Sequence, residues 1–287
     1  MIKFNIPGLY FKKEITIKFL NYCRNNPQEV REDVSIGAVY DSIPYCIWNG
    51  GRIFSNYYQA TKKEILDLKD IFNHDFNIPI RLIYTNAQVE EKHLSDRFCN
   101  LVLELLDGEN NEVVVASDLL EEYIRKTYPQ YKIISSTTKC LSNPNTSLGE
   151  ISKDYFQICL DYNLNHNFDF LESISDKDKV EFLVNAICPP GCPNRKLHYE
   201  LNGKAALNYQ NCYNIECTIQ RGIGTLNSYK NSIQPEEIFG KYKEMGFTNF
   251  KLEGRTLPDS EVAANYVKYM IKPEFQLKCL SQILRRD

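Results

Sequence analysis

Short apolar runs recur along the chain, and a longer stretch with helical spacing follows most of them. Most of these runs are apolar on both faces, which is typical of parallel strands that are covered by helices on each side. The eight runs span residues 2–6, 34–40, 79–85, 112–117, 132–137, 155–161, 180–186 and 248–254. Their regular return predicts a sheet of parallel strands joined by helical crossovers.

The stretches between the runs predict helices. Residues 89–106 place apolar side chains at helical spacing, and residues 259–271 do the same. Residues 235–245 begin with a proline and end before Gly246, as the ends of many helices do. By contrast, the connections at 138–154 and 187–234 show no obvious regular structure. The second is unusually long for a compact domain, which favours a functional role.

Eight strands in alternation with helices predict an α/β fold of the (β/α)8 TIM-barrel type. An open, doubly wound sheet is the alternative, but no GxGxxG turn follows the first run. We expect residues 1–287 to form a single barrel domain. We also expect residues 187–234 to form a cysteine-bearing excursion over the barrel mouth, after the seventh strand.

Composition and charge restrict the partners and the cellular location that we expect for the protein. Its 287 residues carry a formal net charge of −3, which gives no general attraction to nucleic acid. The N-terminal residues lack the uninterrupted apolar core of a signal peptide, and no window approaches the ~18 apolar residues of a membrane span. These observations predict a cytoplasmic protein without a membrane partner. Its ten cysteines are then expected to be thiols or metal ligands.

Four cysteines lie in the long excursion and form the strongest candidate site. Cys188 and Cys192 flank a Pro-Pro-Gly turn in which Gly191 is free to adopt a positive φ, and Cys212 and Cys217 follow. Four thiolates suit either tetrahedral zinc or an iron–sulfur cluster. Cys46, which follows the second strand, could substitute for one of the later two ligands.

Polar residues at strand ends add candidate catalytic groups, because the chemistry of such barrels lies at the carboxyl ends of the strands. Glu253 and Arg255 end the eighth strand and share one face, so they could converge on a ligand or form a structural ion pair. Asp161 and Asn163 end the sixth strand. We expect Asp161 to act in proton transfer or to cap the next helix, and Asn163 to contact substrate.

Three further residues accompany the cysteines. Asn185 lies where the seventh strand meets the excursion, and we expect it to bind a cluster sulfide, substrate or loop backbone. Arg195 and His198 follow Cys192 within one helical turn of each other. We expect Arg195 to bind substrate or to tune a cluster, and His198 to donate a proton in catalysis.

Two motifs resemble the collagenase-like "unassigned peptidase" family, the thirty-second so numbered. They are FLVNAICPPGCPNRKLHY and FKLEGRTLPDSEVAANYVKYM. The resemblance covers residues 155–273 well and implies a barrel that holds a 4Fe–4S cluster on four cysteines. Despite the family's name, its better understood members are oxygen-independent hydroxylases of RNA bases or quinone precursors. Some of them work as pairs of related subunits.

Three hypotheses for function follow. The first is an iron–sulfur-dependent redox enzyme of the hydroxylase type, acting on a small molecule or a modified RNA base, with a related protein subunit as its candidate partner. The second is a non-catalytic binding or assembly barrel in which zinc or a cluster only stabilises the excursion. The third is a peptidase, although the sequence contains neither HExxH nor GxSxG.

Overall fold

The computed structural model describes residues 1–51, 58–108, 110–210 and 230–285. Eight parallel strands close into a barrel in the order of the sequence, so the prediction of a (β/α)8 barrel is confirmed. The strands are β1 (Ile2–Pro7), β2 (Val34–Asp41), β3 (Ile80–Tyr84), β4 (Glu112–Val115), β5 (Lys132–Ser135), β6 (Gln157–Cys159), β7 (Val180–Leu183) and β8 (Asn249–Lys251).

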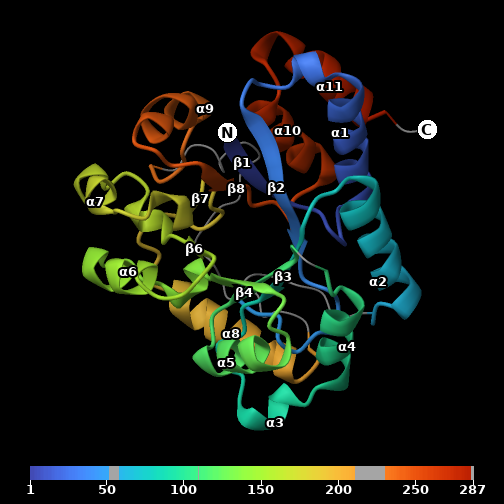
Figure 1. Ribbon diagram of the computed structural model, residues 1–287, viewed down its shortest axis with the longest axis vertical. Coiled ribbons are helices and arrows are strands. Elements are labelled where there is room, and N and C mark those ends of the chain that lie inside the picture. Colours follow the sequence, from blue (N-terminus) through green and yellow to red (C-terminus); the bar gives the residue numbers. More distant parts are fainter. Residues whose placement is uncertain (52–57, 109, 211–229, 286–287) are drawn as a thin grey trace.

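Helices surround the barrel, and three of them, α1, α10 and α11, pack against one another at one side of it (Figure 1). The helices are α1 (Lys13–Asn25), α2 (Lys62–Lys69), α3 (Glu91–Leu94), α4 (Arg97–Leu105), α5 (Asp118–Thr127), α6 (Pro144–Ile151), α7 (Phe168–Ser173), α8 (Arg195–Leu207), α9 (Pro235–Glu237), α10 (Asp259–Met270) and α11 (Gln276–Ile283). Short 3-10 or π-helical turns extend several of these connections, among them η3 (Thr137–Lys139).

Successive side chains of a strand point alternately outward to the helices and inward to the barrel axis, so the barrel has two apolar cores. Outward-facing apolar side chains such as Phe4, Leu82 and Phe250 belong to the large cluster between the barrel and its helices. Inside the barrel, Tyr40 and Val114 belong to a separate small cluster with Ile83 and Ile134. The strands are therefore apolar on both faces at this level, which is why their sequences read as continuous apolar runs.

The deeper part of the barrel interior is polar, and Arg81 is its centre. Its Nε donates to Glu112 Oε2 at 2.5 Å, its Nη1 donates to Glu181 Oε1, and its Nη2 donates to Gln157 Oε1 at 2.9 Å. Asn5 Nδ2 also donates to Glu181 Oε1, at 2.6 Å. Burial lowers the pKa of Arg81, but the two glutamates outweigh it and raise the pKa above its usual value, so this buried cation stays charged.

Three helices differ from the sequence prediction. The stretch 89–106 is divided into α3 and α4, because Asp96 accepts a hydrogen bond from Cys99 N and begins a new helix. The connection at 138–154 contains α6, with Pro144 at its first position and Asn143 as its cap. The excursion at 187–234 contains α8, which its weak amphipathic pattern did not reveal.

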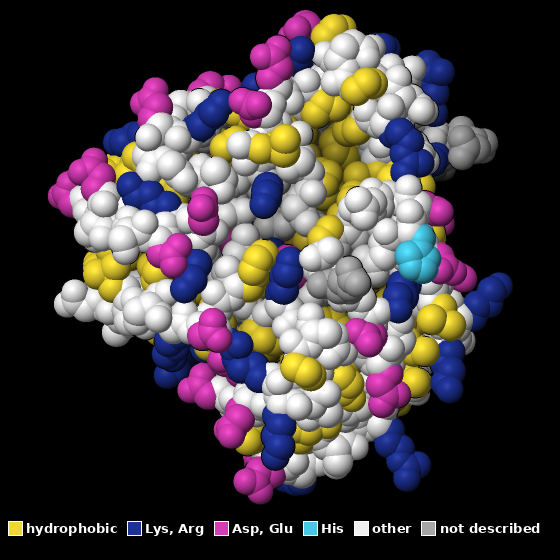
Figure 2. Space-filling view, in the orientation of Figure 1, with side chains coloured by type: hydrophobic (Ala, Val, Ile, Leu, Met, Phe, Trp, Pro, Cys, Tyr) yellow, Lys and Arg dark blue, Asp and Glu magenta, His cyan; other side chains and the backbone are white. Residues whose placement is uncertain are grey.

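The surface agrees with the low net charge. Figure 2 shows acidic and basic side chains intermingled over one face of the molecule, rather than gathered in one basic patch. Among the described residues, no helix has the length and apolarity needed to cross a membrane.

Candidate active site at the barrel mouth

Helix α8 packs against the loops at the carboxyl ends of the strands. Asn202 Nδ2 donates to Gly51 O beyond β2 at 3.1 Å, and Asn86 Nδ2 beyond β3 donates to Gly203 O at 3.0 Å. Gly203 permits this approach, since a Cβ there would lie 2.4 Å from Asn86 Oδ1. The helix thus covers one side of the mouth with a close backbone contact.

The first residue of α8, Arg195, fixes that end of the helix. Its Nη1 donates to Asp161 Oδ2 at 2.7 Å, its Nη2 donates to Thr137 O at 2.6 Å, and its Nε donates to Tyr199 Oη at 3.0 Å. The guanidinium also lies 4.1 Å from the ring centre of Tyr162. Asp161 and Arg195 were predicted as catalytic and substrate-binding residues; the structure pairs them with each other, in the interface between α8 and the barrel.

Below this cover lies a small cavity at the carboxyl ends of seven strands. Its volume is about 40 Å³, which exceeds the ~10–15 Å³ that a single water molecule requires. The cavity can therefore hold a small molecule, or the end group of a larger one. It is lined by Tyr40, Ile83, Thr85, Val114, Ser136, Thr137, Thr138, Cys159, Leu183, Lys251, Glu253 and Arg255.

Lys251 is the most unusual residue of this cavity. It is 8% exposed, and its Nζ lies 4.3 Å from the ring centre of Tyr40. No hydrogen bond or ion pair to a described residue reaches this nitrogen. Burial lowers the pKa of Lys251; Glu181 opposes this shift, and Arg81 and Arg255 add to it. An amine that lines a cavity and has no such partner is a candidate functional group.

Glu253 and Arg255 line the same cavity, but their hydrogen bonds lead to different partners. Glu253 Oε2 accepts from Ile187 N at 2.8 Å, and Arg255 Nη1 donates to Ser42 Oγ. Asn185 joins the two strand ends, since its Nδ2 donates to Glu253 O at 2.9 Å and its Oδ1 accepts from Glu253 N. Glu253 and Asn185 therefore fix the loop after β7. Within the described part of the chain, the other N–H groups of Arg255 have no hydrogen-bond partner.

The turn between Cys188 and Cys192 has the predicted backbone. Gly191 has a φ of +65°, and its N–H donates to Asn163 Oδ1 at 2.9 Å. Asn163 Nδ2 in turn donates to Asp161 Oδ1 at 2.9 Å. Asn163, predicted to bind substrate, thus connects the cysteine turn to the end of β6. His198 lies partly buried in the first turn of α8.

The predicted metal ligands are only partly within the described residues, because Cys212 and Cys217 lie outside them. Cys188 is buried and packs with Cys159, Tyr162 and nearby apolar residues, whereas Cys192 is partly buried. Cys46 belongs to the outer core, where its Sγ lies 3.8 Å from Tyr84 Oη. The described residues bring together no group of three His, Cys, Asp or Glu side chains that could hold a metal ion. The ligand set remains a prediction.

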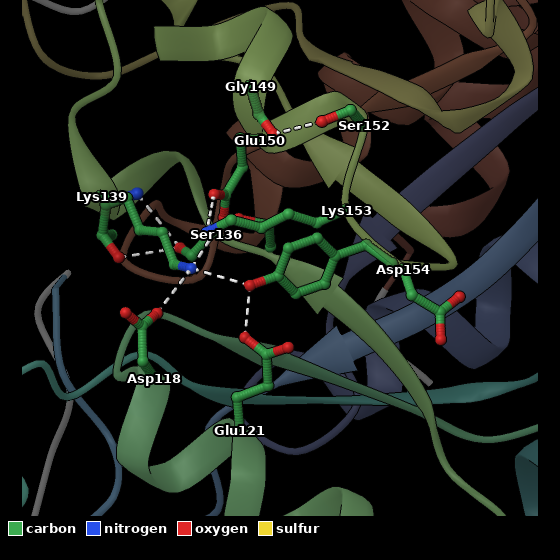
Figure 3. A network of polar contacts seen from close by, with 12 residues as sticks. Asp118, Glu121, Ser136, Lys139, Gly149, Glu150, Ser152, Lys153 and Asp154 are labelled. Carbon is green, nitrogen blue, oxygen red and sulfur yellow. Dashed lines mark hydrogen bonds and ion pairs between the residues drawn. The ribbon is translucent and has the colours of Figure 1, made fainter.

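A polar cluster outside the barrel supports the cavity wall (Figure 3). Lys139 Nζ donates to Glu150 Oε1 of α6 at 2.7 Å, to Tyr155 Oη at 2.9 Å, and to Asp118 Oδ1 of α5 at 3.3 Å. Burial raises the pKa of Glu150, but hydrogen bonds from Lys139, Lys153 and Ser135 outweigh it and hold the pKa at about 2. Lys139 ends η3, whose first two residues line the cavity. The cluster thus fixes this segment between two helices.

Sequence reasoning missed Lys251, although a usable signal was present. Side chains two residues apart on a strand share a face, and this rule was applied to Glu253 and Arg255. The same rule places Lys251, two residues before Glu253, on the same face of the strand, and a lysine inside a buried parallel strand is unusual. Tyr40 and the hydroxyl residues at 136–138 carried no comparable signal, because their positions depend on how the barrel closes.

The chain was compared with protein-family models, with curated protein sequences and with solved structures. No protein-family model matches the chain, and neither does any curated protein sequence. A solved structure described as "The Structure of the U32 Peptidase Mk0906" matches with a TM-score of 0.51 and 18% sequence identity. The match covers 82% of this chain and 91% of the other.

This comparison corrects one prediction and bears out another. The iron–sulfur-dependent redox enzyme predicted from the cysteine spacing is contradicted, since the structural neighbour is described as a peptidase. Close spacing along the chain did not predict the packing of Cys188, whose thiol lies against Cys159 and apolar side chains. The resemblance to the thirty-second peptidase family is borne out in the barrel that this chain shares with the U32 peptidase.

Proposed function

We propose that this chain is a barrel enzyme, distantly related to the thirty-second peptidase family, whose substrate carries a carboxylate that Arg255 holds at the barrel mouth. The observation that carries this proposal is the cavity at the strand ends, which two basic side chains, Lys251 and Arg255, line together. A planar guanidinium with unused N–H groups matches the two oxygens of a carboxylate.

The size of the cavity restricts the ligand. A volume of about 40 Å³ accommodates a carboxylate with a short carbon chain or the carboxyl end of a longer molecule. Ser136, Thr137 and Thr138 supply hydroxyl groups on the wall opposite the β8 strand end. Such a mixture of one charged anchor and several neutral polar groups is typical of small-molecule sites.

The direct test compares propionate with propionamide, which differ in charge but hardly in size. We expect propionate to bind wild-type protein and to raise its melting temperature, and propionamide to do neither. Arg255→Met should abolish the difference, whereas Arg285→Met, at an exposed position beyond α11, should retain it. Equal binding of acid and amide by wild-type protein would refute the carboxylate site.

A peptidase-like reaction is the second candidate, favoured by the description of the structural neighbour. The peptide that fits this mouth is a short one with a free terminal carboxylate. Ser136 Oγ lies 2.8 Å from Thr138 Oγ1, so these two hydroxyls bond to each other rather than to a base. Incubation with a tripeptide and its C-terminal amide tests this candidate: cleavage of the free acid alone supports it, and cleavage of neither argues against it.

A further inference from the structure

We infer that Lys251 is a nucleophile that forms an imine with a small 2-oxo acid in the barrel mouth. The inference deepens the proposed function and rests on it in one respect, since Arg255 would hold the carboxylate of this carbonyl compound. It is carried by the position of Lys251: a buried amine that lines a cavity and has no hydrogen-bond partner among the described residues.

If Lys251 had a structural role, its amine would be expected to donate hydrogen bonds to neighbouring side chains. Arg81, the other buried cation of the barrel interior, donates to three side chains from three different nitrogens. The contact that the structure gives Lys251 Nζ is the face of Tyr40, at 4.3 Å. A cation–π contact contributes about 2 kcal/mol when desolvated, which is less than the several kcal/mol that burial of an ammonium costs.

The environment also favours the reactive form of the amine. Nucleophilic lysines are neutral, and burial lowers the pKa of Lys251; Glu181 and Cys159 oppose part of this shift, and Arg81 and Arg255 add to it. Each unit of decrease raises the neutral fraction at neutral pH about tenfold. Cys159 lies nearby, but burial raises the pKa of its thiol to about 12, so it remains a thiol and a poor nucleophile.

The reaction balances without another reagent. The lone pair of the neutral Lys251 Nζ attacks the carbonyl carbon, and the C=O π electrons move to oxygen. A proton passes from nitrogen to that oxygen and gives a carbinolamine. The C–O bond then breaks as the C=N bond forms, and both amine protons leave with the oxygen as water.

The test is reductive trapping. Wild-type protein is incubated with pyruvate and cyanoborohydride, and the modified lysine is located by peptide mapping. We expect Lys251 to be labelled at least ~10-fold faster than any other lysine, because Arg255 would hold the carbonyl compound beside it in the cavity. Lys132 is the matched control, because it also lies on a strand beneath an aromatic ring, at 4.6 Å, but donates to Asn110 Oδ1.

Acetone and propionate separate this inference from the proposed function. If propionate binds but pyruvate labels lysines evenly, the carboxylate site stands and the imine is refuted. If acetone labels Lys251 as fast as pyruvate does, the nucleophile stands and the role of Arg255 is refuted. Lys251→Met should abolish the selective label and keep the near-ultraviolet circular dichroism of wild type. A large loss of that signal, together with even labelling of the wild type, would assign Lys251 a structural role.

Discussion

Arg81 and Arg255 both belong to the barrel interior, at different depths and with different surroundings. Arg81 is 1% exposed and donates to Glu112, Glu181 and Gln157. Arg255 is partly exposed at the mouth and donates to Ser42. A guanidinium has five N–H groups on three nitrogens. Each nitrogen of Arg81 donates to a side chain, whereas among the described residues Arg255 donates from Nη1 to one side chain.

The difference shows that charged side chains serve two purposes in one barrel: those deep inside stabilise the fold, and those at the mouth can bind a ligand. In the deep layer, the opposite charges compensate for burial and leave little capacity for a ligand. At the mouth, Lys251 and Arg255 border a cavity, where a ligand that enters can reach them. Removal of a deep charge should therefore affect folding, and removal of a mouth charge should affect binding.

The largest expected effect is at the deep position. Arg81→Met leaves the buried carboxylates of Glu112 and Glu181 without their cation, which should lower the free energy of unfolding by about 3–5 kcal/mol. Chemical denaturation measures this change. If the variant is as stable as wild type, the deep network does not stabilise the barrel, and the contrast with the mouth disappears.

A smaller effect is expected where α8 meets the barrel. Gly203→Ala places a Cβ 2.4 Å from Asn86 Oδ1, and the forced shift should cost about 1–3 kcal/mol and weaken propionate binding. Gly149→Ala is the matched control in α6, since its Cβ would meet no atom within 4 Å. That change should instead stabilise by up to about 1 kcal/mol, from helix propensity alone. Equal stability of the two variants would show that α8 does not pack as described.

The cluster around Lys139 should make a pH-dependent contribution of on the order of 1 kcal/mol. The pKa of Glu150 is held at about 2, below its ordinary value of 4.5. Its stabilising effect is therefore complete above pH 4.5 and lost as the pH falls toward 2. Glu150→Gln should be less stable than wild type at pH 7, and the difference should shrink between those limits in parallel denaturation series. A difference that is constant with pH would contradict this assignment.

The sequence was sufficient for the barrel because each strand carries its own signal. Continuous apolar runs such as 79–85 lie where β3 forms, and Pro235 marks the start of α9. The failures were helices with weak periodicity, α6 and α8, whose stability comes from caps and from contacts such as Arg195 with Asp161. These contacts join segments far apart in the chain, which no local pattern reveals.

The candidate site was predictable in part for the same reason. Glu253 and Arg255 were found because strand ends line a barrel mouth, and both line the cavity. The partners that engage Asp161, Asn163 and Arg195 could not be anticipated, since they depend on how α8 and the cysteine turn pack. Cys212 and Cys217 lie outside the described residues, so their role as ligands stays a prediction.

The most direct test of the account is the affinity of Arg255→Lys for propionate. Lysine keeps the charge but loses the planar pair of donors, so the dissociation constant should rise at least ~10-fold, equivalent to about 1.4 kcal/mol. The free energy of unfolding should stay within about 0.5 kcal/mol of wild type, as for a surface substitution. Arg285→Lys, at an exposed position beyond α11, should change neither quantity. Wild-type affinity in Arg255→Lys, or a loss of stability as large as that of Arg81→Met, would contradict the division between a structural interior and a functional mouth.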